Sequence, residues 1–124
     1  MTDVRAQVER FLRRIRNVAR DRRHFDLIPR ASTNSLLLAL GLNSEAVRQE
    51  IVELEVDDYS SGPEEDRDRP GEVWVFGRQV ENLEVYIKLK LVKDSVTGQE
   101  YLKCLSFHEA AYRLKYPLRG HRAN

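Results

Sequence analysis

Residues 83–92 read LEVYIKLKLV, and this stretch alternates strictly between apolar and polar side chains. A period of two is typical of a β-strand with one face turned to the core and the other to solvent. The aliphatic row is Val85, Ile87, Leu89 and Leu91, and the opposite row is Tyr86, Lys88 and Lys90. Because two lysines and a tyrosine are poor core residues, we expect the aliphatic row to be buried and the polar row to be exposed.

Strands are also predicted on both sides of this stretch. They are EVWVFGRQ at 72–79 and QEYLKCLSF at 99–107, and turn residues lie between the strands at 81–82 and 94–98. The three strands therefore predict an antiparallel meander over residues 73–108.

The apolar rows of the last two strands predict their register, because a slip of one residue moves every side chain to the other face. The pairing that keeps both rows on one side matches Val92 with Leu102, Lys90 with Cys104, Lys88 with Ser106, and Tyr86 with His108. This register also buries Leu105 and Phe107. The residues then expected in one exposed patch are Tyr86, Lys88, Lys90, Ser106 and His108.

Helical periodicity dominates residues 1–56. Apolar residues recur at helical spacing over 3–21, and a second, short helix extends to Leu40 and ends at Gly41. This second helix is apolar nearly all round, which predicts that it is buried. A third helix follows a cap at Asn43 or Ser44.

Three segments show neither the period of two of a strand nor the period of a helix. Residues 24–30 predict a short extended connector, since Pro29 keeps its predecessor out of the helical region. Residues 57–72 are acidic and rich in Gly and Pro, which predicts a mobile surface loop. Residues 109–124 form a basic tail, which we expect to dock partly through two tyrosines, Tyr112 and Tyr116.

The order of the elements predicts the fold class. Helices come first and strands follow without alternation, which indicates an α+β fold and not a parallel doubly wound sheet. A length of 124 residues fits a single domain, with the N-terminal helices packed on the C-terminal meander sheet.

The net charge of +1, from 21 basic and 20 acidic residues, conceals a separation of charge along the chain. Residues 1–30 carry +5, residues 43–72 carry −8 and residues 73–124 carry +4. Such separation is typical of proteins that bind nucleic acid or an acidic partner, and also of ordinary solvated surfaces.

Composition argues against several classes of protein. The only cysteine, Cys104, excludes an internal disulfide and a cysteine-rich zinc site. The histidines at 24, 108 and 121 lack metal-ligand spacing, so we expect no metal and no cofactor. No apolar run approaches the roughly 18 residues of a membrane span, and no signal-peptide pattern opens the chain. We therefore expect a soluble, cytoplasmic protein that does not contact membranes.

The expected patch has the chemistry for cleaving RNA without a metal. His108 and Tyr86 are groups for acid–base catalysis, and Lys88 is a cation that stabilises a phosphate. We assign these three as catalytic and four others as RNA-binding: Lys90, Ser106, Lys115 and Tyr116. The alternative is a commonplace polar sheet face that has no catalytic role.

A second basic surface is predicted on the first helix. Its outer face carries Arg5, Arg13, Arg16 and Arg20, with Arg10 and Arg14 beside them. This row is either a binding surface for phosphates or a partner, or a helix face kept soluble by charge.

Four motifs add a resemblance to a known family. IVELEVDDY (51–59), VWVF (73–76), VYIKLKL (85–91) and CLSFH (104–108) resemble the MqsR-type toxins, which are mRNA interferases of bacterial toxin–antitoxin systems. The resemblance implies a RelE/barnase-like α+β fold, an endoribonuclease that cleaves mRNA and a cognate antitoxin. It leaves open whether cleavage takes place on the ribosome.

The resemblance also bears on single residues. Tyr86 matches a catalytic tyrosine of the family, and His108 stands where the family has a catalytic lysine after Ser-Phe. Two other family positions differ, because Ser60 replaces a lysine and Val75 replaces a glutamine. The alternative function is therefore a RelE-like module that binds RNA or a protein and has impaired catalysis.

Overall fold

The structure is a computed structural model and describes residues 3–120. It is an α+β protein in which three helices accompany a five-stranded mixed sheet. The elements are α1 (Val4–Ala19), η1 (Arg22–His24), β1 (Phe25–Leu27), α2 (Ala31–Leu40), α3 (Ser44–Val52), η2 (Val56–Asp58), β2 (Tyr59–Glu65), β3 (Glu72–Val80), β4 (Leu83–Lys93) and β5 (Glu100–Glu109). No helix within residues 3–120 is long and apolar enough to cross a bilayer.

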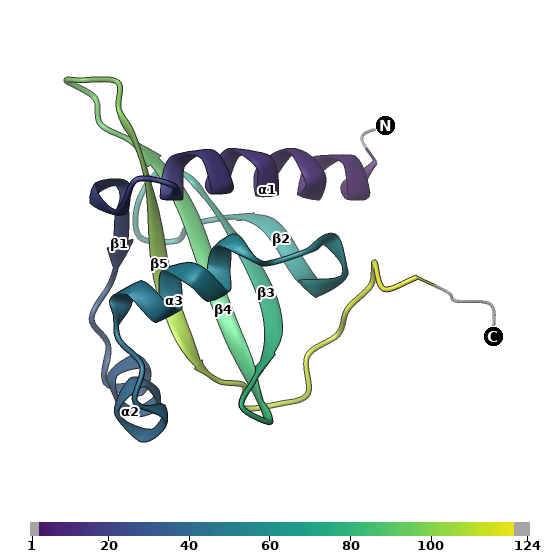
Figure 1. Cartoon of the computed structure of the whole chain (residues 1–124). Coiled ribbons are helices and arrows are strands. Elements are labelled where there is room, and N and C mark those ends of the chain that lie inside the picture. The colour runs from purple at the N-terminus through teal and green to yellow at the C-terminus, as the bar shows by residue number, and fades with distance from the viewer. Residues whose placement is uncertain (1–2, 121–124) are drawn as a thin grey trace.

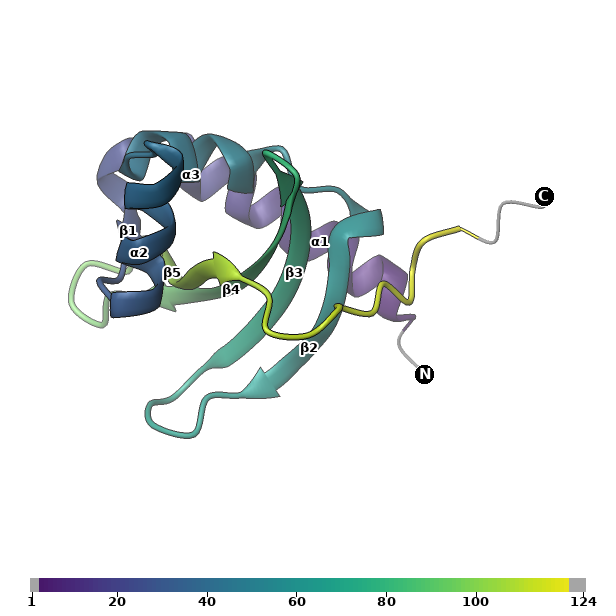
Figure 2. The ribbon, with the colours of Figure 1, turned by 90° about the horizontal axis from the view of Figure 1, so that it is seen from below.

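The predicted meander is confirmed and forms the middle of the sheet. The strand order is β1-β5-β4-β3-β2, and β3, β4 and β5 are antiparallel neighbours. Helices α1 and α3 lie across one face of this sheet (Figure 1), as the α+β prediction requires. The opposite face carries the C-terminal tail (Figure 2).

The acidic segment at 57–72 is not a mobile loop, and that prediction is wrong. Its first half forms η2 and β2, and β2 pairs with β3 through an irregular register that includes Tyr59 opposite Phe76. The irregular pairing hid the strand, because shifts at Ser61 disrupt the period of two. Exposed acids such as Glu64 and Glu65 suit an edge strand, since charge discourages pairing with another chain.

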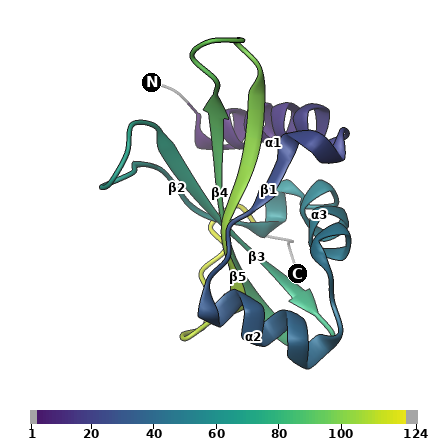
Figure 3. The same cartoon turned by 90° about the vertical axis from the view of Figure 1, so that its left-hand side faces the viewer.

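The connector at 24–30 also supplies a strand. Phe25–Leu27 pairs in parallel with β5, with Phe25 opposite Leu102, so the sheet is mixed and not a pure meander. Figure 3 views the molecule from the side of β1 and α2. The amide of Ile28 then donates to the Cys104 carbonyl (3.0 Å), which extends this contact along β5.

The core lies between α1 and the sheet, as the sequence predicts. Helix α1 begins after Asp3, whose side chain accepts a hydrogen bond from Arg5 N (3.1 Å). Its Phe11 ring stacks on Trp74, with ring centroids 4.4 Å apart. The aliphatic row of β4 is fully buried at Val85, Ile87 and Leu89.

Helix α2 is far less buried than its composition predicts. Leu38 is 87% exposed, and only Thr33 and Leu36 of this helix are buried. The reason is its position, because α2 lies against the edge of β5 instead of inside the core. Thr33 Oγ1 accepts a hydrogen bond from Phe107 N (3.2 Å), so the helix satisfies an edge amide that β1 does not reach.

The register of β4 and β5 is confirmed in one half and wrong in the other. Tyr86 lies opposite His108 and Lys88 opposite Ser106, as predicted. A bulge between Lys88 and Leu89 shifts the remaining pairs by one residue. The bulge places Cys104 in the core and leaves Leu105 partly exposed, the reverse of the expectation for both residues.

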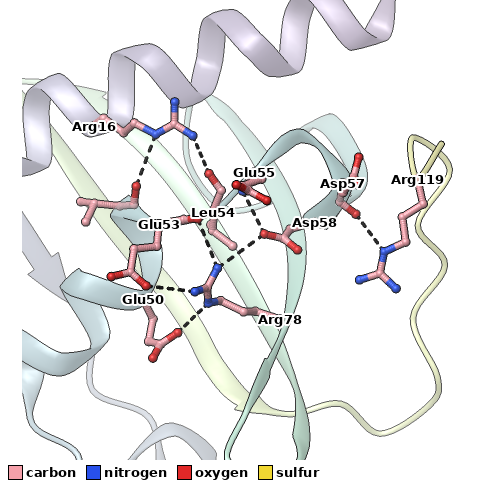
Figure 4. A network of polar contacts seen from close by, with 10 residues as sticks. Arg16, Glu50, Glu53, Leu54, Glu55, Asp57, Asp58, Arg78 and Arg119 are labelled. Atoms are coloured by element: carbon pink, nitrogen blue, oxygen red, sulfur yellow. Dashed lines mark hydrogen bonds and ion pairs between the residues drawn. The ribbon is translucent and has the colours of Figure 1, made fainter.

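Arg78 of β3 connects the acidic segment to the sheet (Figure 4). Its guanidinium contacts Glu50 (2.6 Å), Glu53 (3.0 Å) and Asp58 (3.7 Å). Arg16 of α1 donates to the carbonyls of Val52 (3.3 Å) and Leu54 (2.6 Å) nearby. One positive charge on Arg78 is therefore shared by three of the acidic side chains at 43–72.

The unequal burial of α2 gives a matched pair of variants. We expect Leu36→Ala to lower the free energy of unfolding by about 2–4 kcal/mol, since it leaves a cavity in the core. Leu38→Ala, on the exposed side of the same helix, should change it by less than about 0.5 kcal/mol. Urea denaturation followed by circular dichroism measures both. Equal losses for the two variants would contradict the observed placement of α2.

Candidate functional site

Most of the predicted patch residues line one hollow on the face of the sheet opposite α1. The hollow has a volume of about 540 Å³, and we call it the candidate site. Four predicted residues from β4 and β5 line it: Tyr86, Lys88, Ser106 and His108. The tail contributes residues 110–115, including the predicted Lys115. The predicted patch is thus a concave surface with walls and not a flat sheet face.

Tyr86 and His108 form the centre of the candidate site. They are cross-strand partners, and their rings stack with centroids 5.1 Å apart and an interplanar angle of 15°. His108 Nδ1 lies 2.9 Å from the Glu109 carbonyl oxygen. Because a carbonyl oxygen only accepts, Nδ1 is the donor in this contact, and Nε2 is the ring nitrogen that can act as a base.

The surroundings of Tyr86 keep its phenol protonated. Burial raises the pKa of Tyr86 above its ordinary value, and the Glu64 carboxylate raises it further. Arg30 opposes both effects by lowering the pKa. At neutral pH the phenol is therefore a hydrogen-bond and proton donor and not a base.

Cations surround this pair. Lys88 and Lys115 line the candidate site, together with Arg30 and Arg113, which were not predicted as site residues. Among residues 3–120, none of these four side chains makes an ion pair or hydrogen bond. No acidic side chain of the described residues lines the hollow. Uncompensated cations of this kind attract an anionic ligand.

Sequence reasoning missed Arg30 because its position depends on β1. The parallel pairing of β1 with β5 brings the end of the connector beside the middle of the sheet. Arg30 follows this strand and lies close enough to Tyr86 to affect its pKa. The alternation of Phe25 and Leu27 around Asp26 was the available signal, but three residues are too few to establish a strand.

Lys90 is not available as the predicted RNA-binding residue. Its side chain is buried, and its Nζ lies 2.5 Å from Asp66 Oδ2 in the turn after β2. Gly71 in the same turn lies directly over the lysine stem, where a Cβ atom would approach Lys90 Cε to 2.7 Å. Hydrogen bonding to Lys90 lowers the pKa of Asp66 to about 2. Lys90 therefore holds the β2–β3 turn against the sheet.

Tyr116 anchors the tail instead of facing RNA. Its hydroxyl donates to Glu84 Oε2 (2.6 Å), and Leu114 N donates to the other oxygen of Glu84 (3.1 Å). The tail crosses β3 at Gly77, where a Cβ atom would lie 2.3 Å from the Tyr116 hydroxyl. Docking through Tyr116 is confirmed, but docking through Tyr112 is wrong, because Tyr112 is 86% exposed. Residues 121–124 of the predicted tail lie outside the described residues.

Cys104 is not part of the site. It is completely buried in the core, and burial raises the pKa of its thiol to about 12. A protonated, inaccessible thiol is not a nucleophile at neutral pH. Among residues 3–120, no group of three or more His, Cys, Asp or Glu side chains is arranged to hold a metal ion.

Comparisons with known proteins found no relative of this chain. No protein-family model, no curated protein and no solved structure matches it. Any assignment of function therefore depends on the geometry of the candidate site and on the motifs in the sequence.

The tail wall of the candidate site depends on the space above Gly77. We expect Gly77→Ala to displace Tyr116 and Leu114, because the added methyl group would overlap both side chains. Trypsin should then cut after Lys115 faster than in the wild type. Tyr112→Ala, which changes an exposed tail residue, is the control and should leave the rate unchanged. An unchanged rate in Gly77→Ala would contradict the docking of the tail.

Proposed function

We propose that this protein is a metal-independent endoribonuclease, an mRNA interferase that acts as the toxin of a toxin–antitoxin system. The observation that carries the proposal is the stacked pair of His108 and Tyr86, set among cations that have no partner within residues 3–120. This arrangement combines a base, a proton donor and positive charge at one concave site.

The reaction uses the two stacked rings in different roles. Nε2 of His108 accepts the proton of a ribose 2′-hydroxyl, and the 2′-oxygen attacks the adjacent phosphorus. A bond from phosphorus to the 2′-oxygen forms, and the bond to the 5′-oxygen breaks. The Tyr86 phenol donates its proton to the leaving 5′-oxygen. The products are a 2′,3′-cyclic phosphate and a free 5′-hydroxyl.

The cations of the site stabilise the charge that develops on phosphorus. Lys88 lies between Tyr86 and the buried Lys90 on β4, so its ammonium belongs to the same face as the phenol. Arg30 faces the pair from the β1–α2 connection and adds a guanidinium. Positioned cations that need no reorganisation are most effective in the transition state.

The toxin assignment is supported by the resemblance to MqsR-type toxins and by the α+β architecture. A RelE/barnase-like fold and a cytoplasmic location belong to the same proposal, and mRNA is its substrate. A cognate antitoxin would cover the candidate site or pair with the edge of β2. The edge of β5 is occupied by β1 and α2.

A non-catalytic binding module is the second candidate. Ser60 lines the candidate site at the position where the MqsR-type toxins, which the sequence resembles, have a lysine. Lys90 is bound to Asp66, which removes a further cation from the site. A site with fewer free cations still binds RNA or a protein but stabilises a transition state less.

The two candidates are distinguished by cleavage of a labelled RNA. We expect His108→Ala and Tyr86→Phe each to lower the cleavage rate by about 100-fold or more, the usual range for loss of an acid or base. His24→Ala and Tyr101→Phe are matched controls, because they change a second histidine–tyrosine contact, with centroids 5.3 Å apart, outside the candidate site. The control variants should cleave at the wild-type rate.

The products and the cellular effect complete this test. Cleavage in excess chelator with cyclic 3′ ends, and growth arrest on induction of the wild type but not of His108→Ala, support the proposed enzyme. RNA binding without cleavage by the wild type would reject it in favour of the binding module. Equal activity of all four variants would mean that another site cleaves RNA.

The protonation of Tyr86 predicts the alkaline side of the pH profile. A proton donor is active below its pKa, and the pKa of Tyr86 is raised above its ordinary value of about 10. The cleavage rate should therefore not fall until the pH exceeds about 10. Tyr86→Phe should remove this fall from the residual rate. A fall that starts well below this pH and persists in Tyr86→Phe would exclude Tyr86 as the donor.

A further inference from the structure

A second hollow of about 870 Å³ lies beside the candidate site. The two spaces share Arg30 and Lys88 in their linings, so they lie side by side along β4. The second hollow is bounded by the β2–β3 turn and by the ends of β4 and β5. Figure 2 shows this turn projecting from the sheet on the side away from α1 and α3. We refer to the two neighbouring hollows together as the groove.

Positive charge dominates the second hollow. Six lysine and arginine side chains line it, against two acids, Asp66 and Asp68. Asp66 is already bound to Lys90 (2.5 Å), and the Lys103 ammonium lies 3.8 Å from Asp26. Within the described chain, the Lys93 side chain makes no ion pair or hydrogen bond. The net charge that remains here favours an anionic ligand.

Apolar side chains lie among these cations. Ile28 and Leu105 line the second hollow together with Val92. Leu105 is on this face only because the bulge in the ladder turns it out of the core. A ligand that fits such a lining carries regularly spaced negative charge and also apolar surface. A single-stranded RNA has both, in its phosphates and in its unpaired bases.

We propose that the second hollow is a subsite for single-stranded RNA, in which Lys93 and Lys103 bind phosphates several nucleotides away from the bond that is cleaved. This inference rests on the proposed function, because it extends the same RNA strand beyond the candidate site. Tyr86 of the candidate site and Val92 of the second hollow are six residues apart on the same face of β4, which is about 20 Å at about 3.4 Å per residue. A dinucleotide is too short to reach both ends of this groove.

The subsite is tested with RNA that cannot be cleaved. Oligonucleotides with 2′-O-methyl riboses, of about 4 and about 12 nucleotides, cover the usual range of single-strand site sizes. We expect the longer one to bind wild-type protein more tightly in fluorescence anisotropy. The double variant Lys93→Gln and Lys103→Gln should bind the longer RNA on the order of ten-fold more weakly. Its salt slope should fall by about 1.4, at about 0.7 for each lost phosphate contact.

A matched control separates the subsite from general electrostatics. The double variant Arg13→Gln and Arg20→Gln removes the same charge from the outer face of α1, where both side chains are exposed. It should bind the longer RNA as the wild type does. The double variant Lys93→Gln and Lys103→Arg keeps the charge at residue 103. It should recover about half of the salt slope that the double glutamine variant loses.

Several results would overturn the subsite. The first is unchanged affinity of the double lysine variant for the longer RNA, and the second is an equal loss of affinity in the double lysine and double arginine variants. The third is tighter binding of an acidic peptide than of an RNA of equal charge, which would assign the second hollow to a protein partner. The proposed function fails independently, because RNAs that cannot be cleaved report binding alone, whether or not the wild type cleaves RNA. Loss of cleavage activity and loss of length-dependent binding are thus separate outcomes.

Discussion

The burial of β4 between two neighbouring strands and under α1 is the constraint on which the rest of the structure depends. Val85, Ile87 and Leu89 are completely buried, so the intervening positions have to face the opposite side of the sheet. Tyr86 and Lys88 occupy these positions. The hydrophobic effect that stabilises the core therefore also fixes the direction of the candidate catalytic side chains, without any contact dedicated to that purpose.

The sequence was sufficient to predict the central strands and the pairing of Tyr86 with His108, because β4 alternates strictly. The bulge that shifts the other half of the register could not be predicted from alternation. The sequence was also insufficient for β1, which has three residues, and for β2, whose pairing is irregular. Those two strands have consequences for the site. Arg30 enters it through β1, and Lys90 is withdrawn from it by Asp66 after β2. Non-local pairing of this kind leaves little trace in local periodicity.

The separated charges of the chain are largely recombined by folding. Arg78 forms ion pairs with Glu50, Glu53 and Asp58, and Lys90 forms one with Asp66. The candidate site and the second hollow keep cations for which the described fold provides no acid. The +1 net charge therefore describes neither surface, since some of the acidic residues form ion pairs elsewhere in the fold and the groove retains its positive charge.

The bulge between Lys88 and Leu89 divides β5 into two halves whose side chains alternate in opposite phase. Leu102 and Cys104 point to the core in the half before the bulge, and Phe107 does so in the half after it. Without the extra residue between them, strict alternation through Leu105 would turn His108 inward. Substitutions before the bulge therefore act on the core and on the second hollow, whereas those after it act on the core and on the candidate site. A single inserted residue thus allows substitutions in one half of the strand to alter one hollow without altering the other.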